Sequence, residues 1–532
     1  MAKASDKEIG ITVEKNTPSP LFRDIGVDFF FREAQVAGMN CFPSRTGEPF
    51  RGPKTLALRM TQVLWPGSSG TTTRCSRSPD DDRRGEASRM RRFFGRTAQD
   101  AARLADRAGT LAHPLEAPED LDPLLDRIGD AACVLLGEAS HGTSEYYAWR
   151  ARISERLIQE KDFSFIAVEG DWPDCYEVNR YVKGYRGSGE SAREALCAFE
   201  RWPTWMWANE EISSLVEWLR RRNDGLPEEK KVSFYGLDVY SLWDSLEEVI
   251  EYLERVDPDA LPAARRAYRC FEPYGQDAQE YARATAFVPT SCEDEVVGML
   301  SELSRRIPEY RDDPEARFDA EQNALVARDA EAYYRAMVRG GASSWNVRDR
   351  HMAETLERLM RHHGPGAKAI VWEHNTHIGD ARFTDMADFG MVNVGQLVRE
   401  RRGDEDVVLV GFGSHRGGVI AATEWGAPMQ HMQVPPAREG SWEDILYRAG
   451  EEDKLLVFTS PEEEDGFFEP REHRAIGVIY DPAHERYGNY VPTVLPRRYD
   501  AFLYLDETRA LHPLHVRPRE DGEPPETFPS GE

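Results

Sequence analysis

A carboxylate and an imidazole follow a short apolar run, at Glu138 and His141. The run Val134–Leu136 ends at Gly137, a pattern typical of a buried strand that leads into a turn. If a helix begins after Thr143, both side chains lie near the carboxyl edge of a sheet, where open α/β folds bind ligands. We interpret the pair as the catalytic corner of a hydrolase. The alternative is that Glu138 caps the helix and His141 is a turn residue.

Ionisable side chains also follow three other predicted strands. They are Glu169 and Asp171 after 165–168, Asp238 after 232–237, and His374 and His377 after 369–372. If the strands are parallel, these groups meet at one edge, an arrangement that is costly unless the groups are paired or used. Taken singly, each acid is also explained as a helix cap or surface group. The two histidines are also explained as a buried structural pair on one helical face.

An imidazole held by a carboxylate is suited to general-base chemistry near neutral pH. His141 with Glu138 or Glu169 meets that requirement. Attack of water on a carbonyl then needs a cation or a hydrogen-bond donor for the tetrahedral intermediate. The candidates for that role are Arg150, His374 and His377.

Other hydrolase classes are less well supported. The sequence contains no G-x-S-x-G, and Ser140 lies one residue off the required spacing between Gly137 and Gly142. It contains no H-E-x-x-H either. A metal-dependent hydrolase that uses the same histidines and carboxylates stays open, because such a set suits zinc. Our prediction is a metal-independent hydrolase without a cofactor.

The spacing of apolar residues indicates the elements that must position these groups. Strands and helices alternate from residue 97 to 240, which predicts an α/β fold with a central, largely parallel sheet covered by helices. The stretch 242–363 is helical in pattern and is expected to be a large helical insertion or lid. Further strands are predicted at 407–411, 418–422, 455–458, 476–479 and 502–505. Residues 413–418 form either a hairpin between two of them or a glycine-rich turn near a ligand.

The two ends of the chain differ from the middle in composition. Residues 1–92 mix Pro, Gly, Ser and Arg without a sustained period and are predicted to be irregular and poorly ordered. Residues 516–532 are predicted to be a disordered tail. The chain 93–515 is therefore expected to be the hydrolytic domain. The segment 47–55 superficially looks like a phosphate loop, but it lacks a preceding strand and a proline interrupts it.

Composition limits the partners. With 94 acidic and 67 basic residues the net charge is -27, which argues against nucleic acid and anionic membranes. We find no signal-peptide core and no apolar run near the roughly 20 residues that span a bilayer, so we expect a cytoplasmic protein. The seven cysteines are scattered and contain no C-x-x-C, so no disulfide framework is indicated. The oligomeric state stays open.

An aromatic cluster lies between the second and third predicted strands. Its members include Trp172, Tyr176, Trp202, Trp205 and Trp207. One interpretation is a cleft for a bulky ligand, with or without catalysis, and the other is core or lid packing, since tryptophan buries a large area. For the enzyme we predict substrate contacts by Asp171, Trp172, Trp205 and Asp238.

Several short motifs occur in a fixed order between about residues 110 and 515. They are 137–142, 168–171, 236–240, 348–350 with 352–354, and 374–377. Together they resemble the erythromycin esterase family. The resemblance implies an α/β hydrolase that opens macrolide lactones with activated water and without an acyl-enzyme, on a small-molecule ester or lactone. It implies His141 as general base, Glu138 and Glu169 as its acidic partners, and His374, His377 and Arg150 as the substrate-polarising set.

Overall fold

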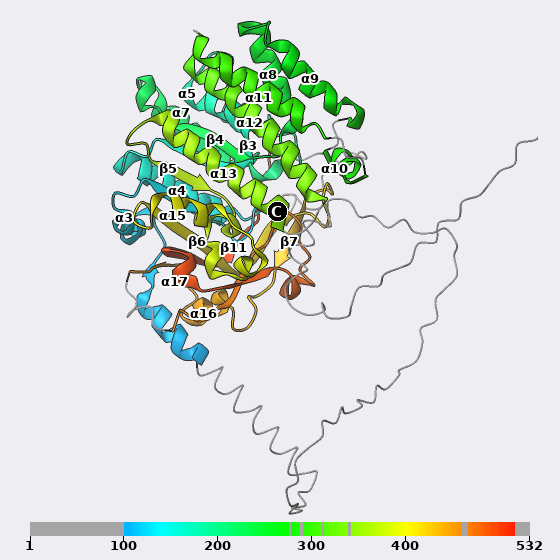
Figure 1. The fold of residues 1–532 in the computed structure, drawn as a ribbon. Helices are drawn as coiled ribbons and strands as arrows, with labels where there is room; N and C mark the ends of the chain where they lie inside the picture. Colours follow the sequence, from blue (N-terminus) through cyan, green and yellow to red (C-terminus); the bar gives the residue numbers. More distant parts are fainter. Residues whose placement is uncertain are drawn as a thin grey trace, which may run out of the picture.

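The computed structural model describes residues 100–275, 278–287, 291–310, 313–338, 342–459 and 466–515. The predictions for 1–92, for 516–532 and for the segment 47–55 lie outside these residues. The described residues build a nine-stranded, largely parallel sheet with helices around it (Figure 1). The predicted α/β class, with a helical insertion, is confirmed.

The centre of the sheet consists of the strands that carry the candidate residues. Its strands run in the order β6–β2–β5–β3–β4 and are parallel. Their bounds are β2 Cys133–Leu136, β3 Phe165–Asp171, β4 Ser233–Asp238, β5 Ala369–Trp372 and β6 Val407–Ala421. Residues in β2 to β5 are all buried, which explains why these strands are continuous apolar runs rather than alternating ones. Because the strands are parallel, their carboxyl ends meet at one edge.

Helices cover both faces of this sheet, and each face has its own core (Figure 1). Leu136 belongs to one core and its neighbour Leu135 to the other, because successive strand side chains point to opposite faces. On the Leu136 face lie α3 Asp122–Ile128, α4 Ser144–Glu160, α6 Ala192–Leu196 and α7 Glu210–Asn223. On the Leu135 face lie α13 Ala342–His363, α15 Val394–Arg402 and α16 Trp442–Arg448, while α5 Trp172–Lys183 contributes to both cores.

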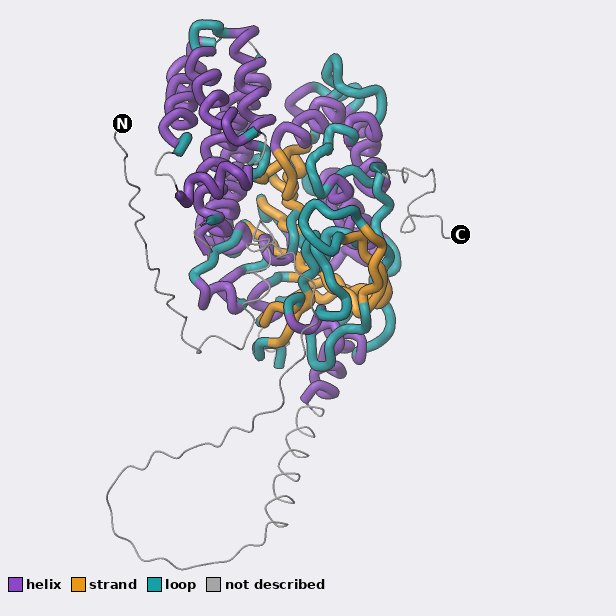
Figure 2. Tube along the Cα trace, turned by 90° about the vertical axis from the view of Figure 1, so that its right-hand side faces the viewer, coloured by secondary structure: helices purple, strands orange, loops and turns teal. Residues whose placement is uncertain are grey.

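The predicted helical insertion is a group of helices beside the sheet. It consists of α8 Leu242–Val256, α9 Leu261–Phe271, α10 Ala278–Phe287, α11 Glu293–Arg306 and α12 Pro314–Met337, and it is followed by α13. These helices share a separate core that includes Leu246, Val296 and Ala324. Figure 2 shows them as a column next to the strand-containing part. Across the described part of the chain, none of the helices combines the length and apolar character needed to cross a bilayer.

The strands after residue 400 differ from the prediction. Residues 407–421 form one strand, β6, so 413–418 is not a hairpin. The reason is that β11 (Ala501–Thr508) pairs with β6 in parallel as far as Gly417 and keeps it extended. The predicted strand 476–479 contributes only isolated bridges to Ser140 and Ala422. The remaining strands are β1 His113–Pro114, β7 Gln430–Val434, β8 Lys454–Val457, β9 Arg471–Arg474 and β10 Tyr490–Thr493.

A disulfide joins Cys270 in α9 to Cys292 at the start of α11, 22 residues apart. The scattered spacing of the cysteines gave no indication of this pair, because pairing depends on how the insertion helices fold together. The bond therefore links two helices of the insertion.

Replacing both cysteines by serine is expected to lower the free energy of unfolding by about 3 kcal/mol. Without the disulfide, the loop between the two residues gains conformational entropy in the unfolded state. Urea unfolding under non-reducing conditions measures the change. Cys197→Ser, at an exposed free cysteine, is the matched control and should leave the midpoint unchanged. Equal midpoints for the wild type and the double variant would contradict a stabilising role for the bond.

Candidate active site

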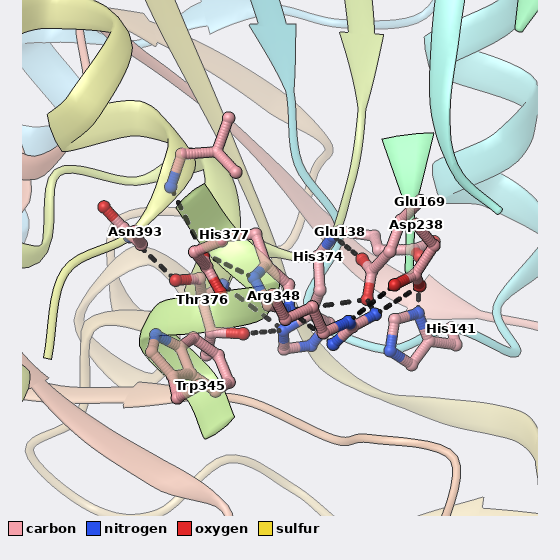
Figure 3. Close-up of polar contacts among 12 residues, drawn as sticks. Glu138, His141, Glu169, Asp238, Trp345, Arg348, His374, Thr376, His377 and Asn393 are labelled. Carbon is pink, nitrogen blue, oxygen red and sulfur yellow. Dashed lines mark hydrogen bonds and ion pairs between the residues drawn. The ribbon is translucent and has the colours of Figure 1, made fainter. Parts of the chain in front are cut away.

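The turn between β2 and α4 carries a hydrogen-bonded carboxylate and imidazole (Figure 3). Glu138 Oε1 lies 2.8 Å from His141 Nδ1, and Arg150 Nη2 donates to Glu138 Oε2 at 2.6 Å. Arg150 is fully buried, with its guanidinium over the rings of Tyr147 and Trp372. This corrects the prediction that Arg150 polarises the substrate. The buried guanidinium instead donates to the Glu138 oxygen that does not contact His141.

Two glycines allow the turn to pack closely against its neighbours. A Cβ on Gly137 would lie 2.1 Å from Asn375 Oδ1, and one on Gly142 would lie 1.9 Å from the Ile420 carbonyl oxygen. Such distances are far below van der Waals contact, so these positions require glycine. The backbone on either side of His141 is thereby fixed against β6 and against the segment after β5.

His374 lies next to His141, with 4.9 Å between the ring centroids. It precedes the short helix α14 (Asn375–Ile378), and its Nδ1 accepts from the Thr376 backbone N–H at 3.3 Å. Burial, together with the neighbouring His141, holds the pKa of His374 well below its usual value. The ring is therefore neutral, and because Nδ1 accepts from Thr376 the ring proton lies on Nε2, with the Ala139 backbone as a neighbouring hydrogen-bond partner of the ring. His374 thus places a neutral N–H donor beside His141.

Glu169 connects the strand ends to α13. Its Oε2 accepts from the His374 backbone N–H at 2.7 Å, and its Oε1 accepts from Arg348 Nη2 at 2.7 Å. Burial alone would raise the pKa of Glu169, but the charges of His377 and Arg348 outweigh burial and hold it well below its usual value. Of the two carboxylates predicted to hold His141, Glu138 makes the hydrogen bond, and Glu169 acts on His141 through its charge.

Arg348, on α13, was not predicted as a site residue. Its Nε donates to Asp238 Oδ1 at 2.9 Å and its Nη2 to Asp238 Oδ2 at 2.7 Å, in addition to Glu169. Burial would raise the pKa of Asp238, but Arg348 outweighs it and lowers the pKa. Asp238, predicted to contact substrate, is thus already occupied in an ion pair with Arg348 of α13. The sequence shows Arg348 only as part of a motif, and only the fold brings it to the strand ends.

His377 is the third imidazole of the site. Its Nδ1 lies 2.9 Å from Asp349 Oδ1, and the ring of Trp345 stacks on it at 4.5 Å with 7° between the planes (Figure 3). Burial would lower the pKa of His377, but Asp349 and Glu169 outweigh burial and raise it to about 9. The raised pKa favours the protonated ring at neutral pH, and Nε2 lies 3.4 Å from Glu169 Oε1 and 3.1 Å from Arg348 Nη1. Trp345 and Asp349 were also missed, because both come from α13.

The raised pKa of His377 makes stability depend on pH. The pKa of His377 is about 9 in the folded protein and 6.5 in the unfolded chain, so protonation of His377 stabilises the folded state by about 3 kcal/mol. This stabilisation is complete below pH 6.5 and is lost as the pH rises through 9. Between about pH 6 and pH 10 the wild type should therefore lose more stability than His377→Asn. Urea unfolding at both pH values tests this, with the exposed His484→Asn as control. Parallel pH profiles for the wild type and His377→Asn would contradict it.

The other predicted substrate contacts are one acid at the end of β3, opposite Asp238, and two buried tryptophans. Asp171 forms an ion pair with Arg201. Trp172 is buried, donates to Asp319 Oδ1 at 2.8 Å and stacks on Tyr235. Trp205 is buried in the core on the α4 face. The predicted substrate contacts of the two tryptophans are corrected to core packing, because large indoles are buried for their area.

Two features bear on the alternative hydrolase classes. Ser140 is buried, and its hydroxyl is hydrogen-bonded to the Thr143 hydroxyl. That contact gives it no base of the kind a nucleophilic serine requires. Within the ranges that the structure describes, we find no group of three or more His, Cys, Asp or Glu side chains arranged to hold a metal ion.

The fold and the site together define a class of protein: a helix-covered, largely parallel α/β sheet that carries imidazoles and carboxylates at its carboxyl edge. The profile of the family described as "Erythromycin esterase" matches residues 158–508, which is more than half of the chain. The chain therefore belongs to the erythromycin esterase family, and the predicted resemblance is confirmed. Membership of this family indicates a hydrolase.

Individual proteins are similar at low sequence identity. Erythromycin esterase type II of Escherichia coli is 23% identical over 371 residues, which cover 65% of this chain and 85% of that protein. The solved structure of a Bacillus cereus protein has a TM-score of 0.65 at 19% identity and covers 78% of this chain and 99% of that chain. The erythromycin esterase EreC, solved in an open conformation, has a TM-score of 0.57 at 18% identity, with 75% and 97% covered. The two solved structures share the fold.

Proposed function

We propose that this protein hydrolyses a carboxylic ester or lactone with water activated by His141. The observation that carries the proposal is the hydrogen bond of 2.8 Å between His141 Nδ1 and Glu138, beside the neutral ring of His374. Because Nδ1 donates to the carboxylate, the lone pair that can take a proton from water lies on Nε2. Arg150 keeps Glu138 in place for this role. A base and a donor are thus side by side.

The reaction then needs only these groups and water. His141 takes a proton as the water oxygen bonds to the carbonyl carbon, and the Nε2–H of His374 donates to the oxygen that becomes negative. The guanidinium of Arg348 adds positive charge nearby, and the raised pKa of His377 favours a second one. When the carbon–oxygen bond to the leaving group breaks, His141 returns the proton to the departing alkoxide. The products are a carboxylic acid and an alcohol, which for a lactone are one opened chain.

A macrolide-type lactone is the substrate that we propose within this class, and antibiotic inactivation is the corresponding role. Support comes from the family and from the Escherichia coli relative named as an erythromycin esterase. The non-catalytic alternative is less well supported, because it leaves the buried donor of His374 and the held base His141 without a use. Catalysis gives both His374 and His141 a role.

A turnover screen tests the proposal. Purified full-length protein is incubated with macrolides, simple lactones and 4-nitrophenyl esters, with and without EDTA, and ring opening is followed as the addition of one water by mass spectrometry. We expect turnover of at least one ester or lactone, at the same rate in EDTA. No turnover of any compound would overturn the proposal. Activity that EDTA abolishes and zinc restores would instead support the metal-dependent alternative.

A further inference from the structure

Two tryptophans from distant parts of the chain meet at the surface. The ring centroids of Trp202 and Trp425 are 4.6 Å apart, with the planes tilted by 56°. Trp425 is 41% exposed, and the indole N–H of Trp202 donates to the Ala427 carbonyl at 3.0 Å. Trp202 follows α6, and Trp425 lies between β6 and β7. An exposed tryptophan packed on a second, partly exposed one forms an apolar surface of the kind that binds ligands.

The position of Trp425 is set by β6, next to the catalytic turn. The Ile420 N–H of β6 donates to the Gly142 carbonyl at 2.9 Å, and Gly142 is the residue after His141. The close approach at Gly142 leaves no room for this contact to shift. Trp425 follows Ile420 by five residues, so the loop that carries it begins beside His141.

The position of Trp202 is set by β3, on the other side of the catalytic residues. Its neighbour Arg201 forms an ion pair with Asp171, which ends β3 two residues after Glu169. The guanidinium of Arg201 also lies over the ring of Tyr240, 5.1 Å from its centroid, and Arg348 lies over the same ring at 4.9 Å. Trp202 is thereby tied to the part of the site formed by Glu169 and Arg348.

The sheet order shows what lies between these two attachments. β2 and β5 separate β6 from β3, and they carry His141 and His374 at their ends. The contact between the tryptophans therefore joins a loop that begins beside His141 to a segment attached to β3 near Glu169. Among the five aromatic residues predicted to line a cleft, Trp202 is partly exposed, whereas Trp172, Tyr176, Trp205 and Trp207 are buried.

We propose that Trp202 and Trp425 select the substrate of this hydrolase by binding the bulky, apolar part of the ester while its carbonyl lies at His141. The inference rests on the proposed function and adds two specificity-determining residues, which favour esters with a large apolar acyl or ring portion. The charged neighbour Arg201 is already paired with Asp171, so the surface that the pair offers is that of the indole rings. An apolar group that covers them removes exposed aromatic area from water.

The test compares two esters that differ only in acyl size, 4-nitrophenyl acetate and 4-nitrophenyl cyclohexanecarboxylate. Trp425→Ala is expected to raise KM for the large ester about 10-fold, the scale of one aromatic contact, and to leave kcat/KM for the acetate within about twofold. Trp425→Phe should retain most of the preference. Tyr487→Ala removes a ring that is 62% exposed elsewhere and is the matched control. Trp202→Phe replaces the indole by a smaller aromatic ring that cannot donate to Ala427. It should show a preference for the large ester between those of the wild type and Trp425→Ala.

Binding without turnover separates this inference from the proposed function. The uncleaved amide N-(4-nitrophenyl)cyclohexanecarboxamide is titrated into wild type and Trp425→Ala by calorimetry, with 4-nitroacetanilide as the small analogue. We expect the variant to lose about 10-fold in affinity for the large amide only. Should the protein cleave no ester, the proposed function fails and this titration still decides the role of the tryptophans. Equal losses on large and small compounds, no loss, or no binding of the large amide to the wild type would overturn the inference.

Discussion

His141→Ala is expected to lower kcat by about 10²- to 10⁴-fold on any ester or lactone that the wild type cleaves, the range of general-base catalysis. The reason is that His141 alone combines a hydrogen bond to Glu138 with a place beside the donor His374. KM should change little, because the imidazole acts on water rather than on the bulk of the substrate. Initial rates over a range of substrate concentrations measure both constants.

Two further variants make the result specific. His484→Ala removes an exposed histidine that is also hydrogen-bonded to an acid, Asp481, and should keep wild-type activity. Glu138→Gln keeps the shape of the side chain but removes the charge that favours the imidazolium, so it should lower kcat without unfolding the protein. Circular dichroism confirms that each variant is folded. Full activity in His141→Ala would remove the basis of the water-activation mechanism.

Arg348→Ala is expected to lower the free energy of unfolding by about 3–5 kcal/mol, the cost of removing one partner of a buried ion pair. The loss is large because the guanidinium neutralises two buried carboxylates: Asp238 would lose its ion pair, and Glu169 would keep only the His374 N–H and His377. Urea unfolding measures the change. Arg350→Ala, at an exposed position two residues along the same helix, controls for loss of an arginine from α13 and should be within about 0.5 kcal/mol of the wild type.

A double-mutant cycle identifies the ion pair as the cause. If Arg348 acts mainly through Asp238, then combining Arg348→Ala with Asp238→Asn should cost less than the sum of the single changes. The remaining cost then reports on Glu169, which also holds the backbone of His374. Additive effects would show that the stability of the site does not depend on this pairing.

The sequence predicted those residues of the candidate site that follow directly after a strand. Glu138, His141, Glu169 and His374 each follow an apolar run, and alternating strands and helices place such run ends at one edge of a parallel sheet. The structure brings these four side chains together through the contacts described above. The identity of the fold class followed from the same pattern.

The parts that could not be predicted depend on contacts between distant segments. Arg348, Asp349 and Trp345 lie on a helix after the insertion, and a helical pattern does not tell which residue reaches the strand ends. Residue type alone also did not separate buried from exposed tryptophans, so Trp172 and Trp205 were assigned to the substrate. The glycines of 413–418 suggested a turn, because a sequence does not show that β11 will pair alongside them.

The tight packing at Gly137 and Gly142 has a consequence for how a protein of this kind diversifies. A methyl group added at Gly137 would collide with Asn375, and one added at Gly142 would collide with β6. The turn that contains Glu138 and His141 therefore tolerates little change at these two positions. The loop that carries Trp425 is under no such restriction, since it is exposed and lies outside the strands. On the proposed function, substrate preference would therefore change by exchange of loop residues, while the residues at the strand ends stay the same.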